Sequence, residues 1–177
     1  ISKCVNEIFY AGRLEDHPPE NVKVSCLLNP FPGHGAVLVE VSPGDDYAVE
    51  QTESGSRLNK GTAAISVKLA LKYIFNDPSL QIGIITPYRA QCRLIQRKLK
   101  EECQDKRVLD KITVGTIHTF QGSERDVVIW DIVEMRNFKI GRLFRGTEGD
   151  RLTNVAITRA KGKLVLVCDP EAFISAP

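Results

Sequence analysis

Three short segments of the sequence place arginine, glutamine, glycine and hydroxyl side chains close together. They are residues 86–91 (TPYRAQ), 114–124 (VGTIHTFQGSE) and 154–161 (NVAITRAK). Arg89 and Arg159 each carry a planar guanidinium that can hold a phosphate through two parallel hydrogen bonds. Gly122 lets the backbone approach a ligand closely, and Tyr88 can stack on a base. The chemistry predicts a phosphate-containing ligand, and ordinary strand–loop–helix connections remain the alternative at this point.

Other kinds of phosphate and metal site are missing from the sequence. It contains no G-x-x-x-x-G-K-[ST] loop, so nothing here cradles a triphosphate with backbone N–H groups. Its five cysteines form no C-x-x-C pair and its three histidines do not cluster, so we expect no metal site. If a nucleotide binds, this chain is only part of its site.

A metal-dependent nuclease is a further alternative. It would use the carboxylates Asp126, Asp131, Glu134 and Asp169. Such chemistry needs carboxylates that converge on about two cations roughly 4 Å apart. Residues 126 and 131 are an odd number of positions apart, so on one strand they would face opposite sides.

Strand-like and helix-like stretches alternate through most of the chain and must position these segments. The predicted strands are 36–41, 81–86, 112–115, 127–133 and 163–168, and the predicted helices are 60–75, one opened by Pro87, 152–160 and one begun by Pro170. This alternation predicts an α/β fold with a mostly parallel central sheet and helices on both faces. Such a sheet binds ligands beyond the carboxyl ends of its strands.

The remaining segments divide the chain into an arm and a domain. Residues 1–35 predict an N-terminal arm with a hairpin, which leads into a domain over residues 36–177. Residues 42–57 predict a polar loop. A second loop, 136–149, carries Arg136, Lys139, Arg142 and Arg145 and is basic enough to meet phosphates, although a solvated loop is the simpler interpretation.

Composition and charge narrow the class of protein. The chain has 177 residues, of which 42% are hydrophobic and 26% charged, as in one packed domain. No run of about 18 apolar residues occurs, so we expect no membrane partner. Scattered cysteines in odd number indicate reduced thiols and a cytoplasmic protein, or a nuclear one in a eukaryote. The chain lacks an initiator Met, so we expect it to be a piece of a longer protein.

Charge is unevenly distributed along the chain. Residues 1–58 hold 4 Lys and Arg against 9 Asp and Glu, whereas residues 59–177 hold 20 against 13. Only the second part has the sign that attracts phosphates.

In this order, the three segments resemble motifs of the second RecA-like domain of superfamily 1 helicases. The resemblance is to the branch that contains the nonsense-mediated-decay, senataxin and Okazaki-maturation helicases. Its fourth, fifth and sixth motifs read T-P-Y-x-x-Q, T-[hydrophobic]-x-x-F-Q-G-x-E-x-D and N-V-A-[LI]-T-R-A. Residues 9–14 (FYAGRL) resemble the F-Y-x-G-x-L element near the domain entry, and Asn59 resembles the Asn of N-x-x-E-A, although Thr62 replaces the Glu. The resemblance covers essentially the whole chain.

The resemblance implies a RecA-like P-loop NTPase fold that lacks its own Walker A loop. In the family, two RecA-like domains of one polypeptide hold ATP with Mg²⁺ between them, and the first domain supplies the phosphate loop and the metal carboxylate. The second domain supplies arginine fingers, which stabilise charge that develops on the γ-phosphate. Here the resemblance assigns that role to Arg159 first and to Arg89 second, with Arg93 one turn later as a substitute for Arg89.

The resemblance also implies contacts with the nucleotide. Glu124 would reach the ribose hydroxyls, and Gln121 and Gly122 would support the phosphate side. Tyr88 would touch the adenine, or equally would pack in the core, and Gln91 completes this set.

Single-stranded DNA or RNA would cross the top of both domains. Thr86, Thr116 and His118 match family positions that contact the strand's backbone, and such contacts carry no base sequence information. His118 is equally suited to a core or interdomain position. The expected function is the second motor domain of an ATP-dependent DNA or RNA helicase. The alternative is a non-catalytic nucleic-acid-binding or protein-docking module with the same fold.

Overall fold

The computed structural model describes residue 13, residues 28–120 and residues 122–174 of the chain. Most of the predicted arm, 1–35, therefore lies outside the described residues, as does the element at 9–14 apart from Arg13. None of the helices in the described part of the chain combines the length and the apolar run needed to cross a lipid bilayer.

A parallel sheet forms the centre of the described structure. In their order across the sheet, its five strands are β1 (Ala36–Glu40), β7 (Ala160–Cys168), β6 (Arg125–Asp131), β4 (Ile82–Ile85) and β5 (Ile112–Gly115). Every neighbouring pair is parallel. Ile85 pairs with Trp130, which in turn pairs with Leu166. The carboxyl ends of the strands therefore share one edge of the sheet, and their amino ends share the other.

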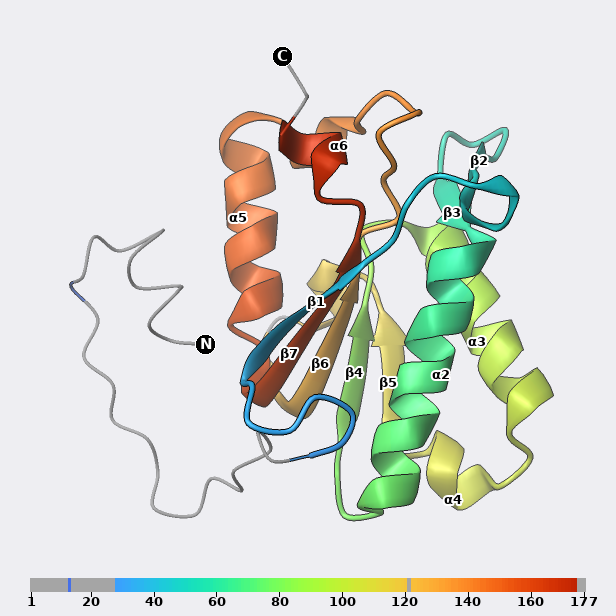
Figure 1. The fold of residues 1–177 in the computed structure, drawn as a ribbon, viewed down its shortest axis with the longest axis vertical. Coiled ribbons are helices and arrows are strands. Elements are labelled where there is room, and N and C mark those ends of the chain that lie inside the picture. Colours follow the sequence, from blue (N-terminus) through green and yellow to red (C-terminus); the bar gives the residue numbers. More distant parts are fainter. Residues whose placement is uncertain (1–12, 14–27, 121, 175–177) are drawn as a thin grey trace.

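Helices cover both faces of this sheet, as the alternation predicted (Figure 1). One face carries α2 (Lys60–Asn76), α3 (Arg89–Glu102) and α4 (Lys106–Leu109), and the other carries α5 (Gly146–Ile157) and α6 (Glu171–Ile174). Alternate side chains of β6 separate the two cores, because successive residues of a strand point to opposite faces. Val127 and Ile129 pack toward α2 and α3, whereas Val128 and Trp130 pack toward α5.

The helix α2 begins at an N-cap that the sequence marks. The side chain of Asn59 accepts a hydrogen bond from the backbone N–H of Thr62 at 3.1 Å. An Asn at this position satisfies one of the free N–H groups of the first turn. The cap uses the backbone of Thr62, so the replacement of the family's Glu by Thr leaves it in place.

Several predicted boundaries are wrong. The polar loop 42–57 contains a 3₁₀ turn, η2 (Asp45–Tyr47), and an antiparallel hairpin of β2 (Val49–Gln51) and β3 (Arg57–Asn59). Strands of three residues are too short to show a period. The helix α3 begins at Arg89 rather than at Pro87, because Tyr88 keeps an extended backbone as its N-cap.

The predicted helix 152–160 is also misplaced. The helix α5 begins at Gly146 and ends at Ile157, and β7 already begins at Ala160. Gly146 and Gly149 in its first turn hide the helical pattern, since glycine is a poor helix former. The basic loop 136–149 therefore includes the start of α5 and a 3₁₀ turn, η4 (Arg142–Phe144).

Candidate functional site

The three motif segments lie at two opposite edges of the sheet. Residues 86–91 follow β4 at the carboxyl edge, and residues 154–161 join α5 to the start of β7 at the amino edge. The middle segment connects the two edges, because it begins at the end of β5 and ends at the start of β6. The expectation of a single site beyond the carboxyl ends of the strands therefore covers only part of the predicted residues.

The middle segment crosses the sheet on the face that α5 covers. Its 3₁₀ turn, η3 (Ile117–Phe120), buries the ring of Phe120 against Gly83 in β4. A Cβ at Gly83 would lie 2.8 Å from that ring, so only glycine leaves room for it. The guanidinium of Arg125 then lies 5.7 Å from the centre of the Phe120 ring and donates to the Thr113 hydroxyl at 3.2 Å. These contacts hold the crossing in place.

At the amino edge, Arg159 follows the last turn of α5. Its Nε donates to the carbonyl of Val155 at 3.2 Å, and its Nη2 donates to the hydroxyl of Thr158 at 3.1 Å. Within the described ranges, no carboxylate forms an ion pair with this half-buried guanidinium. A guanidinium has five N–H donors, so Arg159 is oriented by its own helix end and keeps donors for an anion.

Gly122 and Glu124 lie at the same edge as Arg159. The backbone N–H of Arg125 donates to the carbonyl of Arg159 at 2.9 Å, which ties the two segments together. Gly122 is exposed with φ +77°, a conformation that favours glycine. The side chain of Glu124 is exposed. Gln121, predicted to support the phosphate side, lies outside the described residues.

At the carboxyl edge, the structure brings together the three residues predicted to contact nucleic acid. The backbone N–H of Thr86 donates to the carbonyl of Gly115 at 3.1 Å, so the ends of β4 and β5 lie side by side. Thr116 is half-buried and His118 is exposed. The buried Thr86 hydroxyl has no hydrogen-bond partner among the described residues, which is unusual for a buried polar atom.

Gln91 and Asp131 form a buried polar network at the same edge. The Gln91 amide accepts a hydrogen bond from the Asn59 N–H at 2.8 Å and donates to an Asp131 carboxylate oxygen at 2.7 Å. Ser66 of α2 also donates to Asp131, at 3.3 Å. All four side chains are buried. Burial raises the pKa of Asp131 to about 6, although the hydrogen bonds from Gln91 and its neighbours oppose that rise.

Tyr88 belongs to a second buried cluster, with Glu134 and Arg57. Its hydroxyl donates to the Glu134 carboxylate, which also accepts from Arg57 Nη1 at 2.5 Å. Burial raises the pKa of Tyr88, and the bond to Glu134 adds to that rise. Of the two roles considered for Tyr88, the structure places its ring in packed surroundings, and its contact with adenine stays a prediction. Gln91 is likewise engaged within the protein, and its contact with nucleotide also stays a prediction.

Arg57 was missed by sequence reasoning. It lies in the segment interpreted as a polar loop, where no spacing or motif marks it. Its guanidinium also donates to the carbonyl of Lys139 at 2.7 Å and lies 4.8 Å from the centre of the Phe138 ring. A long-range contact of this kind has no signature in a single sequence.

Arg89 and Arg159 lie far apart. Arg89 is the exposed first residue of α3, just beyond the carboxyl end of β4, and Arg93 follows one turn later. Arg159 directly precedes Ala160, the first residue of β7. Leu166, six residues after Ala160, lies level with Ile85 at the end of β4, because both pair with Trp130. At about 3.3 Å per residue the two levels differ by about 20 Å. The structure therefore places the two predicted fingers at opposite edges of the sheet, and their joint contact with one phosphate stays a prediction.

The four carboxylates considered for a nuclease each have separate partners. Asp126 accepts from the Gln81 N–H at 2.8 Å, and Asp169 accepts from Arg136 Nη2 at 2.7 Å. Asp131 and Glu134 belong to the two networks above. The part of the chain that the structure describes holds no group of three or more His, Cys, Asp or Glu residues able to bind a metal ion. The carboxylates are thus structural acceptors.

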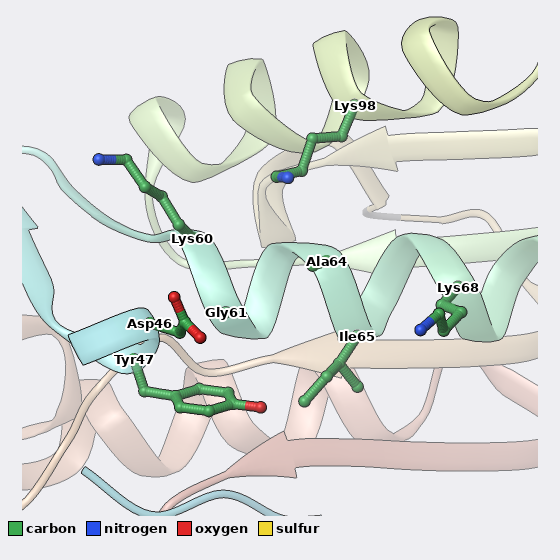
Figure 2. A pocket seen from close by; sticks show the side chains of 8 residues that line it. All are labelled: Asp46, Tyr47, Lys60, Gly61, Ala64, Ile65, Lys68 and Lys98. Atoms are coloured by element: carbon green, nitrogen blue, oxygen red, sulfur yellow. The ribbon is translucent and has the colours of Figure 1, made fainter. Parts of the chain in front are cut away.

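A shallow hollow of about 330 Å³ lies beside the first turns of α2 (Figure 2). Its lining includes Lys60, Lys68 and Lys98 together with Asp46. Figure 2 shows Lys98 reaching from α3 toward α2, whereas the Lys60 ammonium points away from the hollow, toward its ion pair with Glu50 at 2.6 Å. Asp46 and Glu50 offset part of the positive charge, so this hollow attracts anions only weakly.

A doubly covered parallel sheet with these motif segments defines a RecA-like α/β domain, and comparison with known proteins gives its family. A family model described as an AAA domain matches residues 1–171, and the chain belongs to that family. The crystal structure of the C-terminal domain of a possible DNA helicase from Lactobacillus plantarum WCFS1 has the same fold. Its TM-score is 0.50 at 17% sequence identity, over 90% of this chain and 93% of that one.

Two relatives by sequence illustrate the family, one of them named as a DNA helicase and the other as a regulator of nonsense transcripts. The chain is 36% identical over 136 residues to the DNA polymerase alpha-associated DNA helicase A of Saccharomyces cerevisiae. This match covers 73% of this chain and 19% of that protein. It is 33% identical over 178 residues to the regulator of nonsense transcripts 1 homolog of Drosophila melanogaster. This match covers 98% of this chain and 14% of that protein.

With the family match, these relatives identify the chain as a C-terminal domain of a superfamily 1 helicase, of the branch to which the motifs pointed. It spans less than a fifth of the length of the two relatives.

Proposed function

We propose that this chain is the second motor domain of an ATP-dependent DNA or RNA helicase and supplies Arg159 to the γ-phosphate of an ATP held by a first RecA-like domain of the same polypeptide. The observation that carries the proposal is the state of Arg159. Its guanidinium is oriented by Val155 and Thr158 and forms no ion pair within the described residues.

The residues of this chain fit one side of a nucleotide and not the other. Three residues lie together at the amino edge. Arg159 offers a cation, Gly122 a backbone without a side chain, and Glu124 a hydrogen-bond acceptor. The described residues hold no cluster for a metal ion, so Mg²⁺ and the phosphate loop belong to the first domain in this proposal. Bound ATP would supply the phosphoanhydride bond, and Arg159 would stabilise the charge that develops on the γ-phosphoryl group as it passes to water and ADP leaves.

Glu124 is proposed to accept hydrogen bonds from the ribose hydroxyls. Its exposed carboxylate is close in sequence to Arg125, whose backbone is bonded to Arg159. An adenine nucleotide that reaches Arg159 with its γ-phosphate therefore has a polar acceptor at the same edge for its sugar. Arg89 stays a prediction as the second arginine finger, with Arg93 as its substitute.

Nucleic acid is proposed to pass over the carboxyl edge, where Thr86, Thr116 and His118 meet. The unpaired hydroxyl of Thr86 supports this placement, since a buried hydroxyl normally has a partner. It lies at the joined ends of β4 and β5, and the exposed His118 follows the end of β5 by three residues. Contacts from hydroxyl and backbone groups bind any sequence.

The proposal is tested by ATP hydrolysis in two forms of the protein. The full-length protein is expected to hydrolyse ATP faster when single-stranded nucleic acid is added. The isolated chain is expected to show no multiple turnovers, because it has the finger but neither the phosphate loop nor the metal carboxylate. If the isolated chain showed multiple turnovers and Arg159→Ala abolished them, the proposal that this chain supplies only one side of the ATP site would be overturned.

The isolated chain should bind nucleic acid weakly, and its affinity should fall steeply with salt, since its contacts are few and electrostatic. Titration of a labelled oligonucleotide at two salt concentrations measures this. A tight, sequence-specific and salt-independent complex without hydrolysis in the full-length protein would instead favour the docking module.

A further inference from the structure

A second, larger hollow lies at the carboxyl edge of the sheet. Its volume is about 740 Å³, within the range of ligand sites in proteins. One wall is the loop that follows β6, residues 136–146, and the opposite wall is α6, which follows β7. The hollow therefore opens beyond the carboxyl ends of two central strands, where parallel sheets bind ligands.

Three phenylalanine rings line this hollow. Phe144 anchors it, because its ring packs 6.4 Å from Trp130 and 5.4 Å from Phe173, measured between ring centres. Phe138 and Phe173 are half-buried. Exposed or half-exposed aromatic rings are the surfaces on which bases of single-stranded nucleic acid stack, whatever their sequence.

Cationic side chains stand beside these rings. Arg136 shapes the wall and is paired with Asp169 at 2.7 Å and with Glu171, so these three side chains together carry a net charge of −1. Lys139 and Arg145 are exposed and form no ion pair within the described stretch of the chain. Arg145 donates one hydrogen bond, to the carbonyl of Ile140 at 2.9 Å. These two cations remain available for phosphate.

The loop that carries these residues is held in place. Arg57 donates to the carbonyl of Lys139 at 2.7 Å, and its guanidinium lies 4.8 Å from the centre of the Phe138 ring. Gly141 packs so closely against Tyr88 that a Cβ there would lie 2.1 Å from the Tyr88 hydroxyl oxygen. The wall is therefore pre-ordered, which lowers the entropic cost of binding.

From this geometry we infer that the hollow between residues 136–146 and α6 binds a nucleotide unit of the single-stranded nucleic acid, with its base against Phe138 and Phe173 and its phosphate at Lys139 and Arg145. The inference rests on the proposed function, since it extends the strand's path along the carboxyl edge. Aromatic rings beside unpaired cations favour this occupant over an apolar protein segment, which would leave the two cations unmatched.

The hollow beside α2 provides a matched comparison. It has a similar balance of charge, with three lysines opposed by Asp46 and Glu50, but its aromatic residue is Tyr47 alone among those that line it. Removing two cations there changes the net charge of the protein as much as removing Lys139 and Arg145. It should leave the binding of nucleic acid unchanged if the larger hollow is the site.

The test uses the full-length protein and fluorescein-labelled oligodeoxythymidine and oligouridine, titrated by fluorescence anisotropy at several salt concentrations. The double variant Lys139→Ala/Arg145→Ala should weaken binding about tenfold and lower the slope of log affinity against log salt by about one to two. Lys68→Ala/Lys98→Ala should stay within about twofold of wild type. Melting temperatures of both double variants should match wild type.

Stacking is tested separately. Phe138→Leu and Phe173→Leu keep an apolar wall but remove the rings, and each should weaken binding about fivefold or more without changing the salt slope. Phe75→Leu, at an exposed phenylalanine on the far end of α2, is the control. An oligonucleotide carrying 5-iodouracil should crosslink under ultraviolet light to peptides that contain residue 138 or 173.

The outcomes distinguish this inference from the motor assignment. If wild type shows nucleic-acid-stimulated hydrolysis but the Lys139, Arg145 and phenylalanine variants bind with unchanged affinity and salt slope, the hollow is not a nucleotide site and the motor assignment stands. If wild type binds through the hollow but never hydrolyses ATP, the motor assignment falls and this inference stands. Crosslinks only to other surfaces would overturn the inference.

Discussion

Two groups of polar side chains, one at each edge of the sheet, are arranged in opposite ways. At the carboxyl edge, Gln91, Asp131 and Glu134 are buried and engaged in hydrogen bonds within the protein. At the amino edge, Glu124 is exposed, and among the described residues the half-buried side chain of Arg159 bonds only to its own helix end. A closed network stabilises one geometry, whereas open donors and acceptors remain available to a ligand. The same motif letters thus serve two physical purposes.

The difference shows why a motif residue is not automatically a contact residue. Gln91 and Arg159 both belong to motifs of this helicase branch. The Gln91 amide is hydrogen-bonded to Asn59 and Asp131, so its removal should lower the stability of the fold. The Arg159 side chain makes no comparable long-range bond within the described ranges, so its removal should act on chemistry. Four variants, two at each edge, test this contrast.

The largest effect is expected at Arg159. In the full-length protein, Arg159→Ala should lower kcat for ATP hydrolysis by a factor on the order of 10³ or more, because the γ-phosphate loses its finger as charge develops. Affinity for ATP and binding of nucleic acid should change little, and unwinding should fail. Arg159→Lys should rescue poorly, since an ammonium lacks the two-pronged geometry.

Arg151→Ala, at an exposed arginine on the same helix, is the control for Arg159. Melting temperature, nucleotide affinity and kcat are measured on one preparation. A well-folded Arg159→Ala protein with wild-type kcat would show that the finger lies elsewhere. A lower melting temperature with equal loss of every activity would show that Arg159 is structural.

The next effect concerns Asp131 and pH. Its pKa is about 6 in the folded chain against an ordinary value of 3.8. Between these values the unfolded chain has lost the proton that the folded chain keeps, so the free energy of unfolding falls as pH rises. The fall is about 3 kcal/mol and is complete above about pH 6. Asp131→Asn should remove this pH dependence.

Denaturant unfolding at pH 4, 5, 6 and 7 measures the Asp131 prediction. Asp110→Asn, at an exposed carboxylate after α4, should leave the wild-type profile intact. An equal slope against pH in wild type and in Asp131→Asn would mean that this carboxylate titrates normally and is not desolvated by its network.

A smaller effect is expected at Gln91. Gln91→Leu leaves the Asn59 N–H without this acceptor and removes one of the donors to the Asp131 carboxylate, which should destabilise the fold by about 2 kcal/mol. Gln96→Leu, which removes one exposed bond on the same helix, should cost far less. Chemical denaturation measures both. Unchanged stability with weakened ATP binding would support the predicted nucleotide contact of Gln91 instead.

The smallest effect is expected at Glu124. Glu124→Gln keeps an acceptor but removes the charge, so ATP affinity in the full-length protein should weaken about fivefold, or about 1 kcal/mol. Stability should not change, because the side chain is exposed. Glu53→Gln, another exposed carboxylate, is the control. A loss of stability without a loss of ATP affinity would mean that the Glu124 side chain stabilises the fold and does not contact ATP.

The parallel sheet and its helices could be predicted from the sequence because their signals are local. Buried runs such as 82–85 and 127–130 contain no polar side chain, and α2 has a helical period after an Asn cap. The order of the strands follows largely from parallel alternation with helices. The family was indicated by three ordered motifs. The hairpin at 49–59 and the early start of α5 escaped because short strands and glycines carry little pattern.

Tertiary structure alone decided which motif residues face each other. Local sequence sets the direction of a strand or helix, but the crossing of residues 117–125 depends on the packing of Phe120 against Gly83. That crossing carries the fifth motif from the carboxyl edge to Arg159 at the amino edge. Likewise, the contacts of Arg57 with Glu134 and Phe138 join residues 77 and 81 positions apart. Such contacts are set by how whole elements pack, and no spacing in the sequence records them.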